Sequence, residues 1–191
     1  MGMEGYPWER YGLIVELTVR MQAISPQFGK TAIQKMIYLL QAVYTVDYGY
    51  EYSFYTYGPY SFDLSRDLKI IEHHGGLDIC FVNSETKGYI IKPGPDNHLF
   101  REKAANAIHC AESKLDAAVN EFGAYNTREL ELRSTIIYAD RESQFNKIQQ
   151  SRDDFIKLIH NLKPHFEISY ISSVVNEMEE KGFICLNKAC K

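Results

Sequence analysis

Hydrophobic residues recur every three or four positions along the first part of the chain. Two stripes stand out: Ile14, Leu17, Met21 and Ile24, then Ile33, Met36, Ile37, Leu40 and Val43. Residues at this spacing share one face of an α-helix, so the pattern predicts two amphipathic helices, over residues 8–24 and from about Lys30. Ser25-Pro26 separates them, because proline disfavours a helical conformation in the residue before it.

A segment crowded with aromatic residues, DYGYEYSFYTYGPYSFDL, follows the second stripe and alternates in part. Such enrichment favours a β-strand, which we expect Gly58-Pro59 to end because proline cannot continue a strand ladder. Ser61 is then the candidate cap of a third helix, ending at Gly75-Gly76. Farther along, LDICFV and GYIIKP flank the polar turn NSETK, and this pattern predicts a β-hairpin.

The clearest boundary in the chain is Pro93-Gly94-Pro95-Asp96, since it is rigid and polar and continues neither flanking element. Beyond it the spacing of apolar residues predicts four helices: about 99–122, 127–140 with Thr127 as a candidate cap, about 151–162, and a last one closed by Gly182.

The order of elements before this boundary, helix, helix, strand, helix and hairpin, is the ground plan of a winged helix. We therefore predict an α+β protein that is predominantly helical. Its N-terminal domain, 1–93, would be winged-helix-like with a small β-hairpin. Its C-terminal domain, 97–191, would be helical and packed against the first.

Composition and charge narrow the classes of function. The chain has 191 residues, of which 45% are hydrophobic and 24% charged, as in ordinary globular proteins. No window reaches the roughly 18 uninterrupted apolar residues of a membrane helix, and the N-terminus lacks a targeting pattern. We expect a cytoplasmic protein without a membrane partner. A formal net charge of −4 provides no overall attraction for nucleic acid, so DNA binding would need a local basic patch.

The sequence Gly29-Lys30-Thr31 resembles the end of a phosphate-binding loop. That loop also needs a glycine five residues before its last one, and Ile24 stands there. The preceding residues are helical in pattern, whereas the loop should follow a buried strand. We interpret these residues as the start of the second helix and expect no nucleotide cofactor.

No motif predicts catalysis or a metal centre. A nucleophile elbow is absent, and His73-His74 has no second ligand pair at zinc spacing. The scattered Cys80, Cys110, Cys185 and Cys190 indicate reduced thiols in partly buried positions. We expect a protein that is not an enzyme and has no metal or cofactor.

A helix that contains lysines and runs into an apolar Tyr-Leu-Leu sequence, KTAIQKMIYLLQ, leads to YSFYTYGPYS. This combination resembles the uncharacterised YwgA-like proteins and, more distantly, the Panacea domain of SocA-type antitoxins. The resemblance is best over about residues 10–92. The matching positions are Lys35, Tyr38, Leu39, Leu40, Phe54, Tyr57, Gly58 and Pro59. The resemblance implies a helical domain of winged-helix type. Through the Panacea relatives it implies an antitoxin or protease adaptor that acts by binding protein. It supplies no catalytic residue.

The aromatic segment provides the candidate partner surface. Successive residues of a strand face opposite sides, so we expect about half of these rings in the core and the others exposed. Tyrosine is enriched at protein contacts because its side chain combines an apolar ring with a polar hydroxyl group. We predict that Tyr55, Tyr57 and Tyr60, together with Lys35, contact a protein partner. The sequence identifies no partner and leaves a homodimer open.

A winged-helix DNA-binding regulator is the alternative function. The expected reader helix carries Arg66 and Lys69, and the hairpin adds Lys87. Acidic residues of the same helix, Asp63 among them, would repel phosphate. Local charge therefore does not favour DNA over protein.

Overall fold

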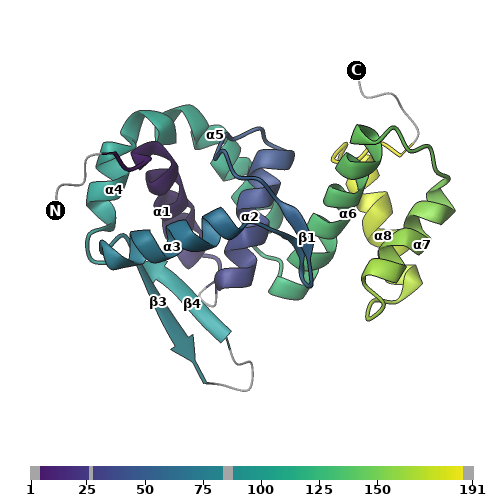
Figure 1. Cartoon of the computed structure of the whole chain (residues 1–191), viewed down its shortest axis with the longest axis horizontal. Helices are drawn as coiled ribbons and strands as arrows, with labels where there is room; N and C mark the ends of the chain where they lie inside the picture. The colour runs from purple at the N-terminus through teal and green to yellow at the C-terminus, as the bar shows by residue number, and fades with distance from the viewer. Residues whose placement is uncertain (1–4, 26–27, 84–87, 187–191) are drawn as a thin grey trace.

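The computed structural model of the chain describes residues 5–25, 28–83 and 88–186 (Figure 1). Within these ranges it is a predominantly helical α+β protein, as predicted. The helices are α1 (Trp8–Gln22), α2 (Lys30–Ala42), α3 (Phe62–His73), α4 (Asn97–Lys103), α5 (Ala105–Phe122), α6 (Thr127–Phe145), α7 (Arg152–Leu162) and α8 (Ile168–Glu180). The strands form two antiparallel hairpins: β1 (Ser53–Tyr55) with β2 (Gly58–Tyr60), and β3 (Leu77–Val82) with β4 (Gly88–Pro93).

Helices α1 and α2 form the centre of the core, since most of their residues are buried. Helix α1 packs against α4 and α5, and α2 packs against α6. Gly12 permits the close approach of α1 and α4, because a Cβ atom there would lie 2.6 Å from the carbonyl oxygen of Phe100. The predicted helices over 8–24 and from Lys30 are confirmed.

The predicted aromatic strand is only partly correct. Residues 46–52 belong to no strand, and the paired strands are short, with Phe54 opposite Pro59. Gly58-Pro59 does not end a strand: it begins β2, and the chain reverses at Thr56-Tyr57. Gly58 makes this conformation accessible, since its φ of 87° is one that side chains with a Cβ rarely adopt. Proline fits here because a two-stranded hairpin has only edge strands.

Helix α3 and the second hairpin match the prediction. The side chain of Ser61 accepts a hydrogen bond from the backbone N–H of Leu64, and so caps α3. Strands β3 and β4 pair from Leu77 opposite Pro93 to Val82 opposite Gly88. Gly29, just before α2, forms an isolated bridge to Ile90, so β4 also contacts the connection between α1 and α2.

Three details of the C-terminal half differ from the predictions, one being that α6 continues to Phe145 and does not end at residue 140. The helix expected over 99–122 is divided at Ala104 into α4 and α5. Helix α6 is capped by Asn126 and not by Thr127: the Asn126 side chain accepts from the N–H of Glu129, whose carboxylate accepts in return. Asparagine takes this place because its oxygen reaches the orphan donors of the first turn from an extended backbone. The stop at Gly182 is confirmed, with φ 71°.

The buried hydrophobic residues of both halves belong to one cluster. Figure 1 shows why: α6 lies between the elements of the N-terminal half and the pair α7 and α8. It contacts α2 and β2 as well as α7 and α8. Whether 1–93 and 97–191 act as separate domains stays a prediction.

Two of the cysteines are more exposed than predicted. Cys80 and Cys110 are exposed, not partly buried as expected, because each lies on an outward face of its element, and Cys190 lies outside the described residues. Among the helices of the described ranges, none is both long and apolar enough to cross a membrane.

Candidate functional site

A pocket of about 300 Å³ opens where hairpin β1–β2 meets the N-terminal halves of α2 and α3. All four residues predicted to contact a protein partner line it: Tyr55, Tyr57, Tyr60 and Lys35. The remaining lining residues are Lys30, Thr31, Gln34, Gly58, Phe62, Ser65 and Leu68. The lining is therefore rich in hydroxyl groups and aromatic rings, contains two lysines, and includes no carboxylate among the described residues.

The rim of the pocket is aromatic and exposed. Tyr55, Tyr57 and Phe62 have exposed fractions of 57%, 61% and 66%. The ring of Tyr60 lies 5.8 Å from that of Tyr55 and 5.0 Å from that of Phe62, centroid to centroid. The rings of Tyr55, Tyr60 and Phe62 form one connected group at the mouth of the pocket.

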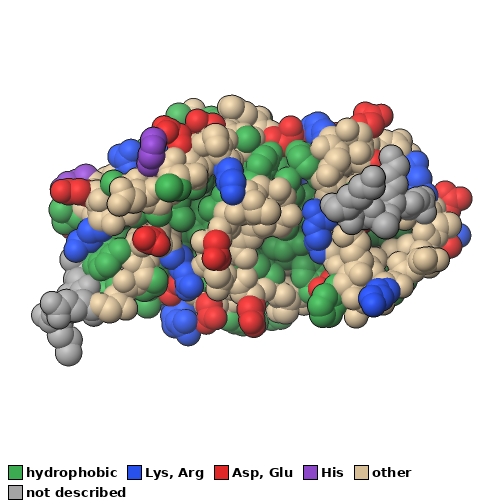
Figure 2. All heavy atoms as spheres, turned by 90° about the horizontal axis from the view of Figure 1, so that it is seen from above, with side chains coloured by type: hydrophobic (Ala, Val, Ile, Leu, Met, Phe, Trp, Pro, Cys, Tyr) green, Lys and Arg blue, Asp and Glu red, His purple; other side chains and the backbone are tan. Residues whose placement is uncertain are grey.

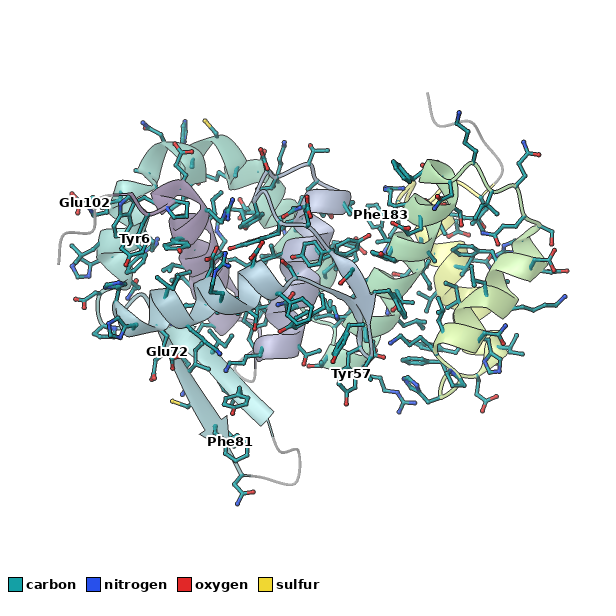
Figure 3. The ribbon with its side chains drawn as sticks, in the orientation of Figure 1. Tyr6, Tyr57, Glu72, Phe81, Glu102 and Phe183 are labelled. Atoms are coloured by element: carbon teal, nitrogen blue, oxygen red, sulfur yellow. The ribbon has the colours of Figure 1, made fainter. Side chains whose placement is uncertain are left out.

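The aromatic group continues onto the second hairpin. The ammonium of Lys30 lies 3.9 Å from the centre of the Tyr89 ring, and Tyr89 contacts Phe81. Figure 3 shows Tyr57 at the tip of the first hairpin and Phe81 on the second hairpin, clear of the helices. We call Tyr55, Tyr57, Tyr60, Phe62, Phe81 and Tyr89 the aromatic surface. It combines a preformed hollow with large exposed rings.

Lys35 lies at the floor of the pocket and is 1% exposed. Its Nζ donates a hydrogen bond of 2.7 Å to the carbonyl oxygen of Pro59 in β2. From the other side, Lys163 at the end of α7 donates to the carbonyl oxygen of Thr56 at 2.9 Å and to Glu131 Oε1 at 2.6 Å. Two buried lysines thus hold the backbone of the hairpin that forms the pocket wall.

The charges beneath the pocket do not cancel when both lysines are protonated. Lys35 and Lys163 face one carboxylate, that of Glu131 in α6. Burial first, and the Lys163 ammonium second, lower the pKa of Lys35 to about 7, with the Glu131 carboxylate opposing the shift. Near neutral pH the protonation of Lys35 therefore responds to any charge placed in the pocket.

Gln34 fixes the junction of β2 and α3 to α2. Its Nε2 donates to the carbonyl oxygen of Ser61 at 2.9 Å, and its Oε1 accepts from the Ser61 N–H at 3.0 Å. Gly58 packs closely as well, because a Cβ there would lie 2.8 Å from Thr135 Oγ1 in α6. The walls are held by polar contacts from α2 and from Lys163 after α7, so the pocket needs little rearrangement to bind.

Sequence reasoning missed Gln34, Ser61, Glu131 and Lys163 as parts of this site. A signal existed for Gln34, because polar residues of a helix buried on every side need buried partners. For Lys163 no local signal exists, since its partner Thr56 is 107 positions away.

The residues of the DNA-binding alternative lie outside the pocket. Arg66 is exposed on α3 and pairs with Asp63 of the same helix at 2.9 Å. Lys69 is exposed on that helix too, and Lys87 lies outside the described residues. Asp67 points inward, where it accepts hydrogen bonds from Tyr11 and Tyr50. On the face shown in Figure 2, acidic and basic side chains are interspersed.

Other candidate chemistry has no support from the geometry of the described residues. In those ranges no group of three or more His, Cys, Asp or Glu side chains is placed to hold a metal ion. His74 contacts the hydroxyl of Tyr6 at 3.3 Å. Lys30 and Thr31 begin α2, as predicted, and both line the pocket.

No family model matches this chain, and a search of curated proteins found no match either. The resemblance to YwgA-like and Panacea proteins therefore stays a hypothesis based on its motifs. The pocket and the aromatic surface are the features of the described residues that bear on function.

Proposed function

We propose that this protein is a non-enzymatic, cytoplasmic interaction protein that binds a protein partner through the aromatic surface. The observation that carries the proposal is the arrangement of exposed rings around a preformed pocket. The resemblance to antitoxin-type domains agrees with such a role, as an antitoxin or a regulatory adaptor.

Physical reasons favour a protein partner at this surface. Tyrosine and phenylalanine bury much apolar area while few side-chain torsions are fixed, and tyrosine is enriched among residues that dominate binding energy. A pocket next to such rings can receive an anchoring side chain of the partner. Because Gln34 and Lys35 hold the wall in place, binding would lose little free energy to ordering of the chain.

DNA binding remains the second candidate. One observation supports a winged-helix arrangement: the connection before α2 bridges to β4, a strand of the hairpin that would be the wing. Against it, Arg66 is already paired with Asp63 on the exposed face of the would-be reader helix. Titration with duplex DNA at two salt concentrations separates the candidates, since phosphate contacts must weaken as salt rises.

Site-specific photo-crosslinking tests the proposal. A benzophenone amino acid placed at Tyr57 should capture a defined protein in cells, and the same group at Phe145 should not. Phe145 is a matched control because it is 84% exposed and lies outside the aromatic surface. Adding Phe62→Ser should reduce capture from position 57 about fivefold or more, as expected for one interface ring.

Three outcomes would contradict the proposal. Capture of the same proteins from both positions would show that the surface is not selective. Capture of a second copy of this chain, and of no other protein, would show that the surface forms a homodimer and does not bind a different partner. If Phe62→Ser leaves capture unchanged, the captured partner does not bind through the aromatic surface.

A further inference from the structure

We propose that the pocket binds the carboxylate of an organic acid, with the carboxylate against Lys35 and Lys30 and the apolar body against the tyrosines. The inference rests on the proposed function and deepens it, because it names the group of the partner that enters the pocket. Two sources offer this chemistry: the C-terminal end of a protein chain and a free organic acid.

The lining of the pocket is one-sided in charge. Lys30 and Lys35 are the charged residues that line the pocket, the Lys30 ammonium lying 3.9 Å from the centre of the Tyr89 ring, and no carboxylate belongs to the described lining. Below the floor, Lys163 adds a third amino group against the single carboxylate of Glu131. Buried charges need partners of opposite sign. An anion in the pocket would balance the positive charge of Lys35 and Lys163 that Glu131 alone does not balance.

Unused hydrogen-bond donors point to the same ligand. Protonated lysine has three N–H donors, and the Lys35 ammonium has one acceptor among the described residues, the carbonyl oxygen of Pro59. Lys163, in contrast, has acceptors on both Thr56 and Glu131. A carboxylate oxygen at Lys35 would form a charge-assisted hydrogen bond, which is stronger than a neutral one.

The rest of the pocket fits an apolar body. Tyr55, Tyr60 and Phe62 supply ring faces, and Leu68 adds an aliphatic wall. A volume of about 300 Å³ suits a small aromatic acid or the last side chain of a peptide. Phosphate alone would leave this apolar wall without contact, so an organic acid fits better.

Proton uptake should accompany binding. Above about pH 7 the free Lys35 is mostly neutral, whereas a carboxylate beside it favours the ammonium and raises its pKa. The other groups that face Lys35 are Lys163 and Glu131 below it, and Lys30 with the three tyrosine hydroxyls around the pocket. Affinity should therefore fall as pH rises above about 7.

The first test compares 3-phenylpropionate with 3-phenylpropionamide, its neutral analogue of nearly equal shape. Calorimetric titration of the full chain at pH 7 should show the acid binding about tenfold more tightly or better, as one charge-assisted hydrogen bond predicts. At pH 8, the binding enthalpies measured in Hepes and in Tris should differ, because the protons taken up on binding come from the buffer. The difference should equal the number of protons taken up multiplied by the difference between the ionisation enthalpies of the two buffers.

Substitutions identify the lysines. Lys35→Met should remove the preference for the acid, and Lys30→Met should reduce it. Lys69→Met is the matched control, because Lys69 is exposed on α3 outside the pocket and its loss should change nothing. Circular dichroism and melting curves check folding. If Lys35→Met does not fold, the preference of the wild type and the effect of Lys30→Met remain decisive.

A peptide arm distinguishes the two sources. The tripeptide acetyl-Gly-Gly-Phe with a free carboxylate, compared with its C-terminal amide, mimics a protein chain end. Tighter binding of the peptide acid than of 3-phenylpropionate supports a chain end, and the reverse supports a free acid.

Equal affinity for acid and amide, or no binding of either at millimolar concentration, would overturn the inference. These failures are distinct from a failure of the proposed function. Selective crosslinking at Tyr57 without any preference for acids would leave protein binding in place. A preference for acids without crosslinking would leave a small-molecule pocket.

Discussion

Lys35 lies on a helix that is buried on every side from Ala32 to Leu40. A protonated lysine in such a place loses the hydration of its ammonium, and one backbone carbonyl replaces only part of it. The second ammonium nearby makes the protonated state still less favourable. Lys35 therefore makes the stability of the fold depend on pH, and it makes binding in the pocket depend on the charge of the ligand.

The sign of that link follows from the two pKa values of Lys35. Its pKa is about 7 in the folded chain and 10.5 when unperturbed, so between these values the unfolded state binds more protons. The free energy of unfolding should therefore rise with pH from about 7 upward, by at most about 1.4 kcal/mol per pH unit. Urea denaturation at pH 7, 8 and 9 measures it.

Lys35→Met should remove this rise, because the remaining side chain cannot titrate. Lys69→Met is the control and should keep the slope of the wild type, since Lys69 is exposed. Equal slopes for wild type and Lys35→Met would show that Lys35 stays protonated in the folded chain.

Hairpin β1–β2 is the element that makes the site, and its geometry depends on Gly58. The residue has a positive φ and lies against Thr135 of α6. Both conditions exclude a Cβ. The strand pairs formed after the reversal at Thr56-Tyr57 bring the rings of Tyr55 and Tyr60 within 5.8 Å of each other in the lining of the pocket.

Gly58→Ala should therefore destabilise the protein through strain and contact together, by about 2–4 kcal/mol. Gly182→Ala is a matched control: its φ is 71°, but a Cβ there would meet nothing within 4 Å. It should lose only about 1 kcal/mol, the cost of the backbone conformation alone. Chemical denaturation of both variants gives the comparison, and equal losses would mean that the contact with Thr135 is unimportant.

Elements with a strong pattern of their own could be predicted from the sequence. The stripes of α1 and α2, the Ser61 cap and hairpin β3–β4 each depend on neighbours in the chain. The turn at Thr56-Tyr57 was missed, because it lacks the Asn-Gly or Asp-Gly signal of a tight hairpin. The cap at Asn126 was placed one residue late, since Thr127 is also a good cap type.

The candidate site was predicted in its residues but not in its construction. The tyrosines were recognisable because they crowd one segment, and Lys35 because it belongs to the motif of the resemblance. That they line one pocket depends on tertiary packing. The ion pair of Lys163 with Glu131 joins α7 to α6 and, through Thr56, to the hairpin. A single sequence carries no trace of such a contact.

At the scale of the whole molecule, Lys163 connects the C-terminal helices to the pocket. Its side chain is 1% exposed and that of Glu131 is 8% exposed, so each partner is buried and depends on the other. Lys163→Met would leave the Glu131 carboxylate buried without its ion-pair partner, with His165 at 3.7 Å and the largely neutral Lys35 as the remaining basic groups that face it. Removal of one partner of a buried pair costs about 3–5 kcal/mol.

We therefore expect Lys163→Met to lower the free energy of unfolding by about that amount, and Lys163→Met with Glu131→Gln to recover part of it. Lys157→Met, on the same helix, removes an exposed pair with Asp154 and should change stability by less than about 0.5 kcal/mol. Hydrogen exchange locates the effect. Loss of Lys163 should speed exchange in residues 53–60 as well as in α7, because its ammonium also holds the carbonyl of Thr56. Faster exchange in α7 alone would show that the hairpin keeps its position without the C-terminal helices, and that the pocket belongs to the N-terminal half by itself.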